Sequence, residues 1–302
     1  MVESHFLDER TARDIDGRVA KLLRDLDNPE PPLELELVRA CLELDRAYYS
    51  PSDASVLEET VHRLKVAGKQ VVRRPGLLLD VVREFNLRAL WVPDRKRILL
   101  DSEVPKPKQR WNEAHEIGHS LIPWHGDMMH GDKERTLRFN CQVRLEAEAN
   151  YAAGRLLFLR DAFQARLLDG SAAFTQIRAL SKEFGNTMTS GLWRAVECFV
   201  IPAFGLVSQH PLSWNPELEL VRYFLRSRSF QKRFPNVTAS QAFSGLEGIC
   251  RGRRGPIGEG EVLLSDANEE QHVFHVECFY NGHEALSFGV YQRARTVRVA
   301  VP

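Results

Sequence analysis

This 302-residue chain contains, at residues 96–125, the stretch KRILLDSEVPKPKQRWNEAHEIGHSLIPWH. A short apolar run opens it, and from Arg110 to Ile122 the apolar residues recur at the spacing of an amphipathic helix. Pro123 ends this pattern, because proline cannot continue a helix. The stretch therefore predicts a strand that leads into a buried helix, with the sequence HEIGH at residues 115–119 on that helix.

The pattern H-E-x-x-H is typical of zinc hydrolases, and helix geometry explains why. Positions four apart lie one above the other, so His115 and His119 can both reach one Zn²⁺ while Glu116 lies near the water that the metal activates. A chain of this composition would contain the pattern by chance about 0.04 times. The alternative is an ordinary amphipathic helix with two unrelated histidines, and the small and apolar residues around the motif count against it.

A catalytic zinc ion needs a third protein ligand, for which the residues leave two candidates. His125 lies ten residues after the first motif histidine, the spacing of a longer zinc motif, but isoleucine replaces the glycine which that motif needs. The other candidate is Glu146 on a predicted helix at 141–159, with Asn150 one turn later to hydrogen-bond a ligand. Glu148 is two residues from Glu146 and is interpreted as a solvated charge.

The stretch at 96–125 and the sequence LEAEANYAAGRLLFL at 145–159 together resemble the ImmA/IrrE family of metallo-endopeptidases. The resemblance covers about residues 60–200, and the chain departs from the family pattern at Ala152, where the family has phenylalanine. It implies a role for each matching residue: zinc ligands His115, His119 and Glu146, catalytic carboxylate Glu116, and Asn150 as the hydrogen-bond partner of a ligand. Two imidazoles and one carboxylate would accept Zn²⁺ or Mn²⁺.

The function that follows is a zinc-dependent endopeptidase in which Glu116 is the general base toward water. The resemblance implies a protein substrate, a helix-turn-helix transcriptional repressor cut in a stress or mobile-element response. The alternative is a regulatory binding protein whose zinc site is structural or vestigial, and a purely structural site has no need of Glu116. Tyr151, His125 and His130 are open candidates for stabilising the oxyanion.

Composition and charge bear on the other classes of partner. Lys and Arg together number 41, and Asp and Glu together also number 41, so the formal net charge is zero. No net charge therefore draws the chain to nucleic acid or to an anionic membrane. No apolar stretch approaches the ~20 residues of a membrane span, and the charged N-terminus lacks a secretory signal, so we expect a cytoplasmic protein. Residues 177–196 superficially resemble a helix-turn-helix but carry few basic residues, so direct nucleic-acid binding is not expected. Five scattered cysteines predict reduced thiols, and the oligomeric state stays open.

The rest of the chain predicts an α+β fold. A mainly helical zincin-like peptidase domain with a short β-hairpin or small sheet is followed by a smaller α+β C-terminal domain. The predicted domains are an N-terminal helical segment at 1–50, the metallopeptidase at 51–200, and a sensor or substrate-binding domain at 201–302. Further predicted helices lie at 6–26, 33–49, after Ser50, at 174–185, 189–200 and 216–228. Predicted strands lie at 87–92 and 96–101, and in alternating runs between 262 and 301 that follow a flexible Arg/Gly-rich break at 251–260.

Overall fold

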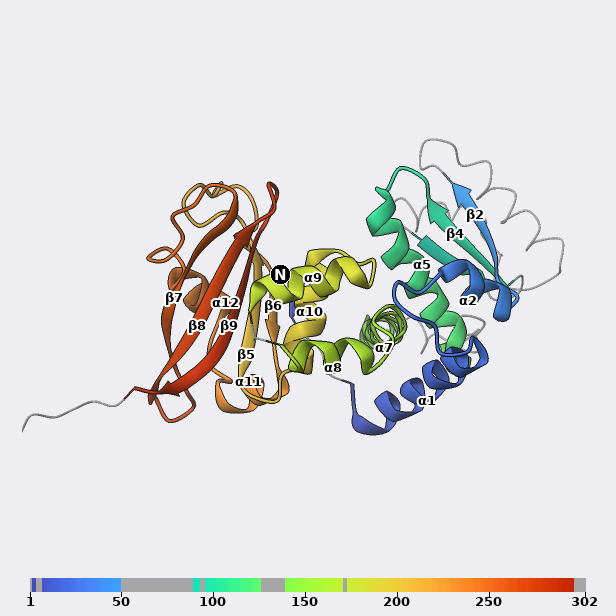
Figure 1. Ribbon diagram of the computed structural model, residues 1–302, viewed down its shortest axis with the longest axis horizontal. Coiled ribbons are helices and arrows are strands. Elements are labelled where there is room, and N and C mark those ends of the chain that lie inside the picture. The colour runs from blue at the N-terminus through green and yellow to red at the C-terminus, as the bar shows by residue number, and fades with distance from the viewer. Residues whose placement is uncertain are drawn as a thin grey trace, which may run out of the picture. The chain divides into compact units, whose positions relative to one another are not determined.

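A computed structural model gives the fold of the chain (Figure 1). It describes residues 2–3, 7–49, 89–92, 96–125, 139–170 and 173–295. The fold is α+β, as the sequence predicted, and the chain divides into two compact units. The helical unit comprises Leu7–Ala162 and Glu183–Asn186, and the sheet unit comprises Met1–Phe6, Phe163–Lys182 and Thr187–Pro302.

The helical unit is organised around helix α5 (Lys106–Leu121), which begins with prolines in its first turn and ends at Ile122, just before Pro123. This helix packs against α7 (Phe139–Leu157) and against a three-stranded sheet of order β2-β4-β3. The predicted hairpin is present as antiparallel strands β3 (Ala89–Val92) and β4 (Arg97–Asp101).

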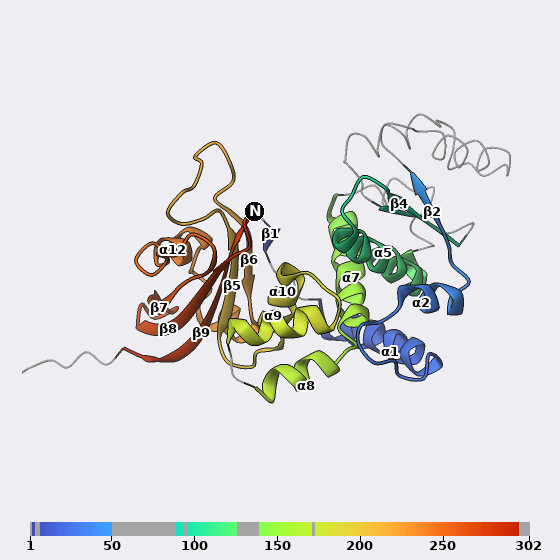
Figure 2. The same cartoon turned by 45° about the horizontal axis from the view of Figure 1, so that its top comes forward.

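Two N-terminal helices complete the described part of this unit. Helix α1 (Glu9–Asp25) is capped by the side chain of Asp8, and it packs against α7, α5 and the short helix α2 (Leu35–Cys41). The apolar residues that predicted a helix at 6–26 form its buried face, among them Ile15 and Val19. Figure 2 shows α1 and α5 alongside α7, the arrangement that positions the site described below.

The helix predicted from Leu33 to Tyr49 is wrong in its second half. Helix α2 ends at Cys41, Glu43 has a left-handed backbone with φ of 56°, and Asp45–Tyr49 form strand β2. This strand pairs in parallel with β4. The partner strand lies far along the sequence, so local helix propensity was overridden by a pairing that local spacing cannot reveal.

The sheet unit contains a six-stranded sheet of order β1-β6-β5-β9-β8-β7 (Figure 2). Its strands are β1 (Val2–Glu3), β5 (Ala203–Ser208), β6 (Val221–Arg226), β7 (Gly255–Ser265), β8 (Gln271–Tyr280) and β9 (Ala285–Ala294). All neighbours pair antiparallel except β1, which runs parallel to β6. The expected β-rich C-terminal part is therefore one continuous sheet.

Helices cover both faces of this sheet. The main core of the sheet unit joins Phe204 and Phe274 of the sheet to Phe230 of α11 (Arg228–Arg233) and to α12 (Ala239–Ser244). On the other face Gly205 lies close to α10 (Met188–Cys198). Two further helices are α8 (Ala162–Leu168) and α9 (Phe174–Glu183). The strand β5 is buried along its whole length because both faces are covered.

Two expectations about this unit are wrong. The helix predicted at 216–228 is strand β6 preceded by a loop, in which the Asn215 side chain accepts a hydrogen bond from the Glu217 N–H and stabilises a turn. The flexible break predicted at 251–260 is the start of the sheet, since β7 begins at Gly255 and the N–H groups of residues 251 and 252 donate to Ile257.

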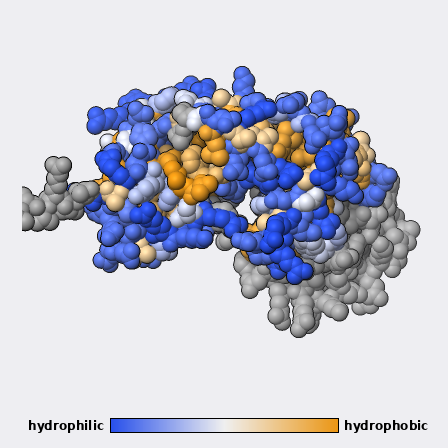
Figure 3. All heavy atoms as spheres, turned by 60° about the horizontal axis from the view of Figure 1, so that its bottom comes forward, coloured by the Kyte–Doolittle hydropathy of each residue, from blue (hydrophilic) through white to orange (hydrophobic). Residues whose placement is uncertain are grey.

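The remaining expectations concern thiols, membranes and segments that lie outside the described residues. Cys41, Cys198, Cys250 and Cys278 are free thiols, which agrees with the prediction for four of the five cysteines. Within the described ranges no helix has the length and apolarity needed to cross a membrane. Figure 3 shows one face of the molecule, where hydrophilic residues cover most of the coloured surface between smaller apolar patches. The helix predicted after Ser50 and the strand predicted at 296–301 fall outside the described residues.

Candidate metal centre

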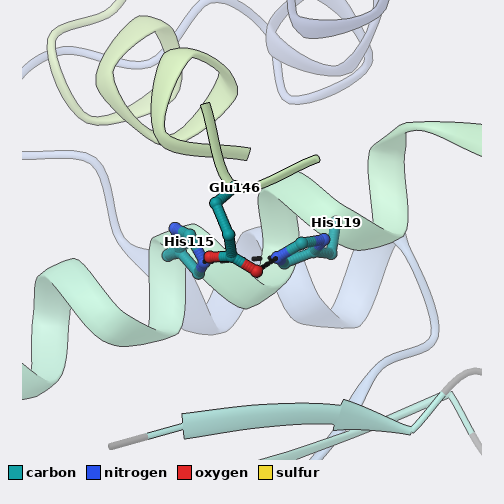
Figure 4. A group of neighbouring side chains, drawn as sticks. All are labelled: His115, His119 and Glu146. Carbon is teal, nitrogen blue, oxygen red and sulfur yellow. Dashed lines mark hydrogen bonds and ion pairs between the residues drawn. The ribbon is translucent and has the colours of Figure 1, made fainter. Parts of the chain in front are cut away.

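The structure brings together three of the side chains that the sequence singled out (Figure 4). His115 and His119 lie one turn apart on α5, and their Nε2 atoms are 3.2 Å apart. Glu146 reaches them from α7, with one carboxylate oxygen 3.1 Å from His115 Nε2 and the other 3.7 Å from His119 Nε2. Two imidazole nitrogens and a carboxylate therefore converge on one point.

The close approach of α5 and α7 explains how Glu146 reaches the two histidines. A Cβ atom on Gly118 would lie 2.7 Å from the backbone oxygen of Ala149 and 3.2 Å from the Cβ of Ala152. Only a residue without a side chain allows this contact. The glycine of the HEIGH motif thus brings α7 close to the motif histidines.

The nitrogen of each histidine that faces away from this point is held by another side chain. His115 Nδ1 is 3.0 Å from Asn150 Oδ1, and His119 Nδ1 is 2.8 Å from His125 Nδ1. An amide oxygen can only accept, so the Nδ1 of a neutral His115 carries the hydrogen and Nε2 keeps its lone pair. This arrangement points the unprotonated nitrogen of His115 at the cluster.

The surroundings also set the charges of the cluster. Burial, with the nearby His115, lowers the pKa of His119 to about 3, so this ring is neutral at pH 7. Burial alone would raise the pKa of Glu146, but the hydrogen bond to His115 and the charges of the neighbouring histidines lower it. The pKa of His115 is raised, since the hydrogen bond to Glu146 and the charges of Glu116 and Glu146 outweigh burial. A proton therefore competes with a metal ion mainly at His115.

Glu116 is buried at 5% exposure, and its charge acts on His115. It is not one of the three converging donors. A buried carboxylate whose charge acts on His115, but which lies outside the donor set, is suited to accept a proton from water.

Glu148 is not the solvated charge that its position in the sequence indicated. Its side chain is fully buried, and its Oε2 accepts hydrogen bonds from Trp124 Nε1 at 2.6 Å and from His125 Nε2 at 3.0 Å. Its other oxygen accepts from Arg144 Nε at 2.7 Å. The four-residue spacing of Arg144 and Glu148 was the one sequence signal of a structured carboxylate.

His125 and Tyr151, two of the candidates for the oxyanion, are engaged elsewhere. Both nitrogens of His125 have side-chain partners, and the Tyr151 hydroxyl lies 3.1 Å from Asp16 Oδ2, to which it can donate. His130, the third candidate, lies outside the described residues.

A second cluster in the sheet unit is a poorer match for a metal ion. Asp266, Glu270 and His272 lie close together, but the Arg233 guanidinium is 3.4 Å from His272 Nδ1 and 3.9 Å from Asp266 Oδ2. A fixed positive charge there opposes a cation. The cluster on α5 and α7 instead presents two nitrogens and one carboxylate, the donor set of a catalytic zinc site with three protein ligands.

Residues 65–190 match the IrrE N-terminal-like domain, Peptidase_M78. The structure is similar to a solved Mycobacterium tuberculosis transcriptional regulator, with a TM-score of 0.52 and 11% sequence identity over 97% of this chain and 96% of that one. At this identity the likeness shows the fold alone. No curated protein sequence matches the chain.

Proposed function

The chain carries a metallopeptidase-like domain of the M78 (IrrE N-terminal-like) family at residues 65–190, and from this premise we propose that it is a metal-dependent endopeptidase. His115, His119 and Glu146 hold one divalent ion, with Zn²⁺ preferred and Mn²⁺ as the alternative. The convergence of their donor atoms on one point carries this proposal.

In the proposed reaction each residue has a separate task. A bound ion supplies a positive charge that acidifies water and polarises the scissile carbonyl. Glu116 accepts the proton of the attacking water and delivers it to the amine that leaves. Asn150 holds His115 in the orientation in which Nε2 faces the ion.

The proposed substrate is a protein of the cytoplasm, a helix-turn-helix repressor, as the family resemblance implies. In this proposal the helical unit cuts the substrate, and the sheet unit senses a signal or holds the substrate. The three donor residues all belong to the helical unit, which supports this division of labour.

A second candidate is a regulatory binding protein whose metal site is structural or vestigial. The name of the structural neighbour, a transcriptional regulator, favours it. The buried Glu116 beside the donor set favours the enzyme, because a structural site has no use for it.

The decisive comparison is between the wild type and Glu116→Gln. We expect both to hold one equivalent of metal by elemental analysis, and only the wild type to create new amine termini when added to an extract of cellular proteins. Failure of the wild type to bind metal would overturn the proposal. Stoichiometric metal in both proteins, with no new termini from either, would favour the regulatory candidate.

A further inference from the structure

A buried chain of side chains extends from His119 away from the donor set. His119 Nδ1 contacts His125 Nδ1 at 2.8 Å, and His125 Nε2 contacts Glu148 Oε2 at 3.0 Å. His125 and Glu148 have no solvent exposure. Neither is among the converging donors, and neither was assigned a role in the reaction proposed above.

We propose that His125 and Glu148 are positioning residues that hold the proton of His119 on Nδ1, so that Nε2 of His119 is free to bind the metal. This inference rests on the proposed role of His119 as a ligand. The order of donors and acceptors along the chain supports it.

The carboxylate end fixes the direction of the hydrogen bonds. An ionised Glu148 only accepts, so Nε2 of His125 carries a hydrogen and donates it. In a neutral His125 the Nδ1 atom is then an acceptor, and the Nδ1 of His119 must donate to it. The remaining nitrogen of His119, Nε2, therefore presents a lone pair to the donor set.

The opposite order would be unfavourable at this site. A proton added to His125 would make both of its nitrogens donors, and the hydrogen of His119 would then move to Nε2. Such a proton would also place a second cation near Arg144, which already pairs with Glu148 at 2.7 Å. A neutral His125 therefore favours a metal ion bound at Nε2 of His119, because it adds no positive charge near that ion.

The partners of Glu148 hold it in place for this task. Trp124 Nε1 and Arg144 Nε each donate to it, so both carboxylate oxygens are engaged. Trp124 and His125 lie in helical residues that follow the break at Ile122, where the His125 N–H donates to the Ile122 carbonyl at 3.0 Å. His125, which its spacing in the sequence made a candidate ligand, therefore contacts the proposed ligand His119 on the side away from the donor set.

The test is the affinity for Zn²⁺, measured by competition with a chromophoric chelator. We expect Glu148→Gln and His125→Leu to bind Zn²⁺ about 10–100-fold more weakly than the wild type. His125→Asn, whose amide oxygen offers an acceptor near the position of Nδ1, should lose less than His125→Leu. Glu197→Gln is the matched control, because Glu197 also accepts from a tryptophan, Trp193, but contacts no histidine in the described residues, and its affinity should be unchanged.

The outcomes separate this inference from the proposed function. A wild type that binds no Zn²⁺ would refute the metal site itself. Folded Glu148→Gln and His125→Leu proteins with wild-type affinity would refute only the positioning role. If these variants do not fold, long-range ¹⁵N–¹H NMR of the metal-free wild type decides, since we expect the His119 proton on Nδ1, and a proton on Nε2 would overturn the inference.

Discussion

At His119 the two ring nitrogens have different partners. Nε2 faces His115 and Glu146, whereas Nδ1 faces His125 in the interior of the helical unit. His115 repeats this division with Asn150. A histidine held by one nitrogen keeps its orientation in the absence of metal, so the site is preorganised by its own side chains.

Acidification should destabilise the metal-free protein before its carboxylates titrate. Burial and the nearby His115 lower the pKa of His119 to about 3, while an unfolded histidine titrates near 6.5. Between these values the unfolded chain binds a proton that the folded chain does not. The free energy of unfolding therefore falls as the pH drops below about 6.5, by at most about 1.4 kcal/mol per pH unit from this group.

Urea titrations of the helical-unit transition at pH 7, 6 and 5 would measure this slope. His125, whose pKa burial also lowers, acts in the same direction. The raised pKa of His115 affects stability in a different pH range. The free energy that His115 adds to folding is fully present below a pH of about 6.5 and is lost as the pH rises through the pKa of His115 in the folded protein. His119→Asn should flatten the slope, and an unchanged slope in that variant would contradict the assignment.

The identity of the third ligand gives a separate prediction. Glu146→Ala removes a donor atom, whereas His125→Leu leaves all three donors in place. We expect Glu146→Ala to fall below one equivalent of Zn²⁺ under conditions in which His125→Leu, despite its weaker binding, is still filled. Elemental analysis after gel filtration compares them, and the reverse order would make His125 the ligand.

The sequence predicted residues that share one helix better than residues that meet across helices. His115 and His119 lie four residues apart, so helix geometry alone predicts that their side chains lie close together. Glu146 followed from the family resemblance and from its spacing to Asn150. Glu148 was misread because its partner His125 lies in the segment after α5, and the path of that segment depends on packing that spacing does not encode.

At the scale of elements, the contact between α5 and α7 controls the site. Gly118 lies against the backbone of Ala149, one turn along α7 from Glu146. Any widening of this contact would move the carboxylate away from the two histidines. The sequence predicted one helix from its periodicity and the other from its helix-favouring residues, but it gave no measure of the distance between them.

Gly118→Ala should therefore destabilise the protein although alanine favours helix. The added Cβ would meet a backbone oxygen at 2.7 Å, and overpacking of this kind costs about 1–3 kcal/mol, more than the helix-propensity gain of about 1 kcal/mol. Zn²⁺ affinity should fall as well. Gly154→Ala in α7 is the control, because nothing lies within 4 Å of its Cβ position, and there we expect a gain of about 0.5–1 kcal/mol.

Chemical denaturation of the two glycine variants measures both effects. A stabilised Gly118→Ala with unchanged Zn²⁺ affinity would show that the helices can separate without cost. Equal losses in both variants would point to a general intolerance of substitution rather than to the contact with Ala149.

One of the elements predicted wrongly, strand β2, depends on a partner that is distant in the sequence. Strand β2 was expected to be helix because its pairing with β4 is parallel and remote in sequence, and strand β6 was expected to be helix although it lies between β1 and β5. The hairpin of β3 and β4 was predicted correctly, since its strands are adjacent along the chain. For β2, the distance along the sequence to its partner explains why the local residue pattern did not reveal the strand.

At the scale of the whole molecule, each compact unit has its own set of buried residues. The three donor residues lie in the helical unit, and the phenylalanine-rich core around Phe204 and Phe274 lies in the sheet unit. Helix α10 groups with the sheet, although the sequence placed residues 189–200 in the peptidase domain. If the two units have separate functions, as proposed, we also expect each unit to unfold with its own free energy.

Calorimetry of the 302-residue chain should show two transitions, only one of which responds to metal. At 100 times its dissociation constant Zn²⁺ stabilises the unit that binds it by about 2.7 kcal/mol, so the helical-unit transition should move to higher temperature. Phe274→Ala removes a buried ring from the sheet core and should lower the free energy of unfolding of the sheet unit by about 3–5 kcal/mol. The sheet-unit transition should then move to lower temperature, while the Zn²⁺-induced shift of the helical-unit transition persists. A single transition that both changes move together would contradict this, because it would mean that the two cores unfold as one and that the metal stabilises the whole chain.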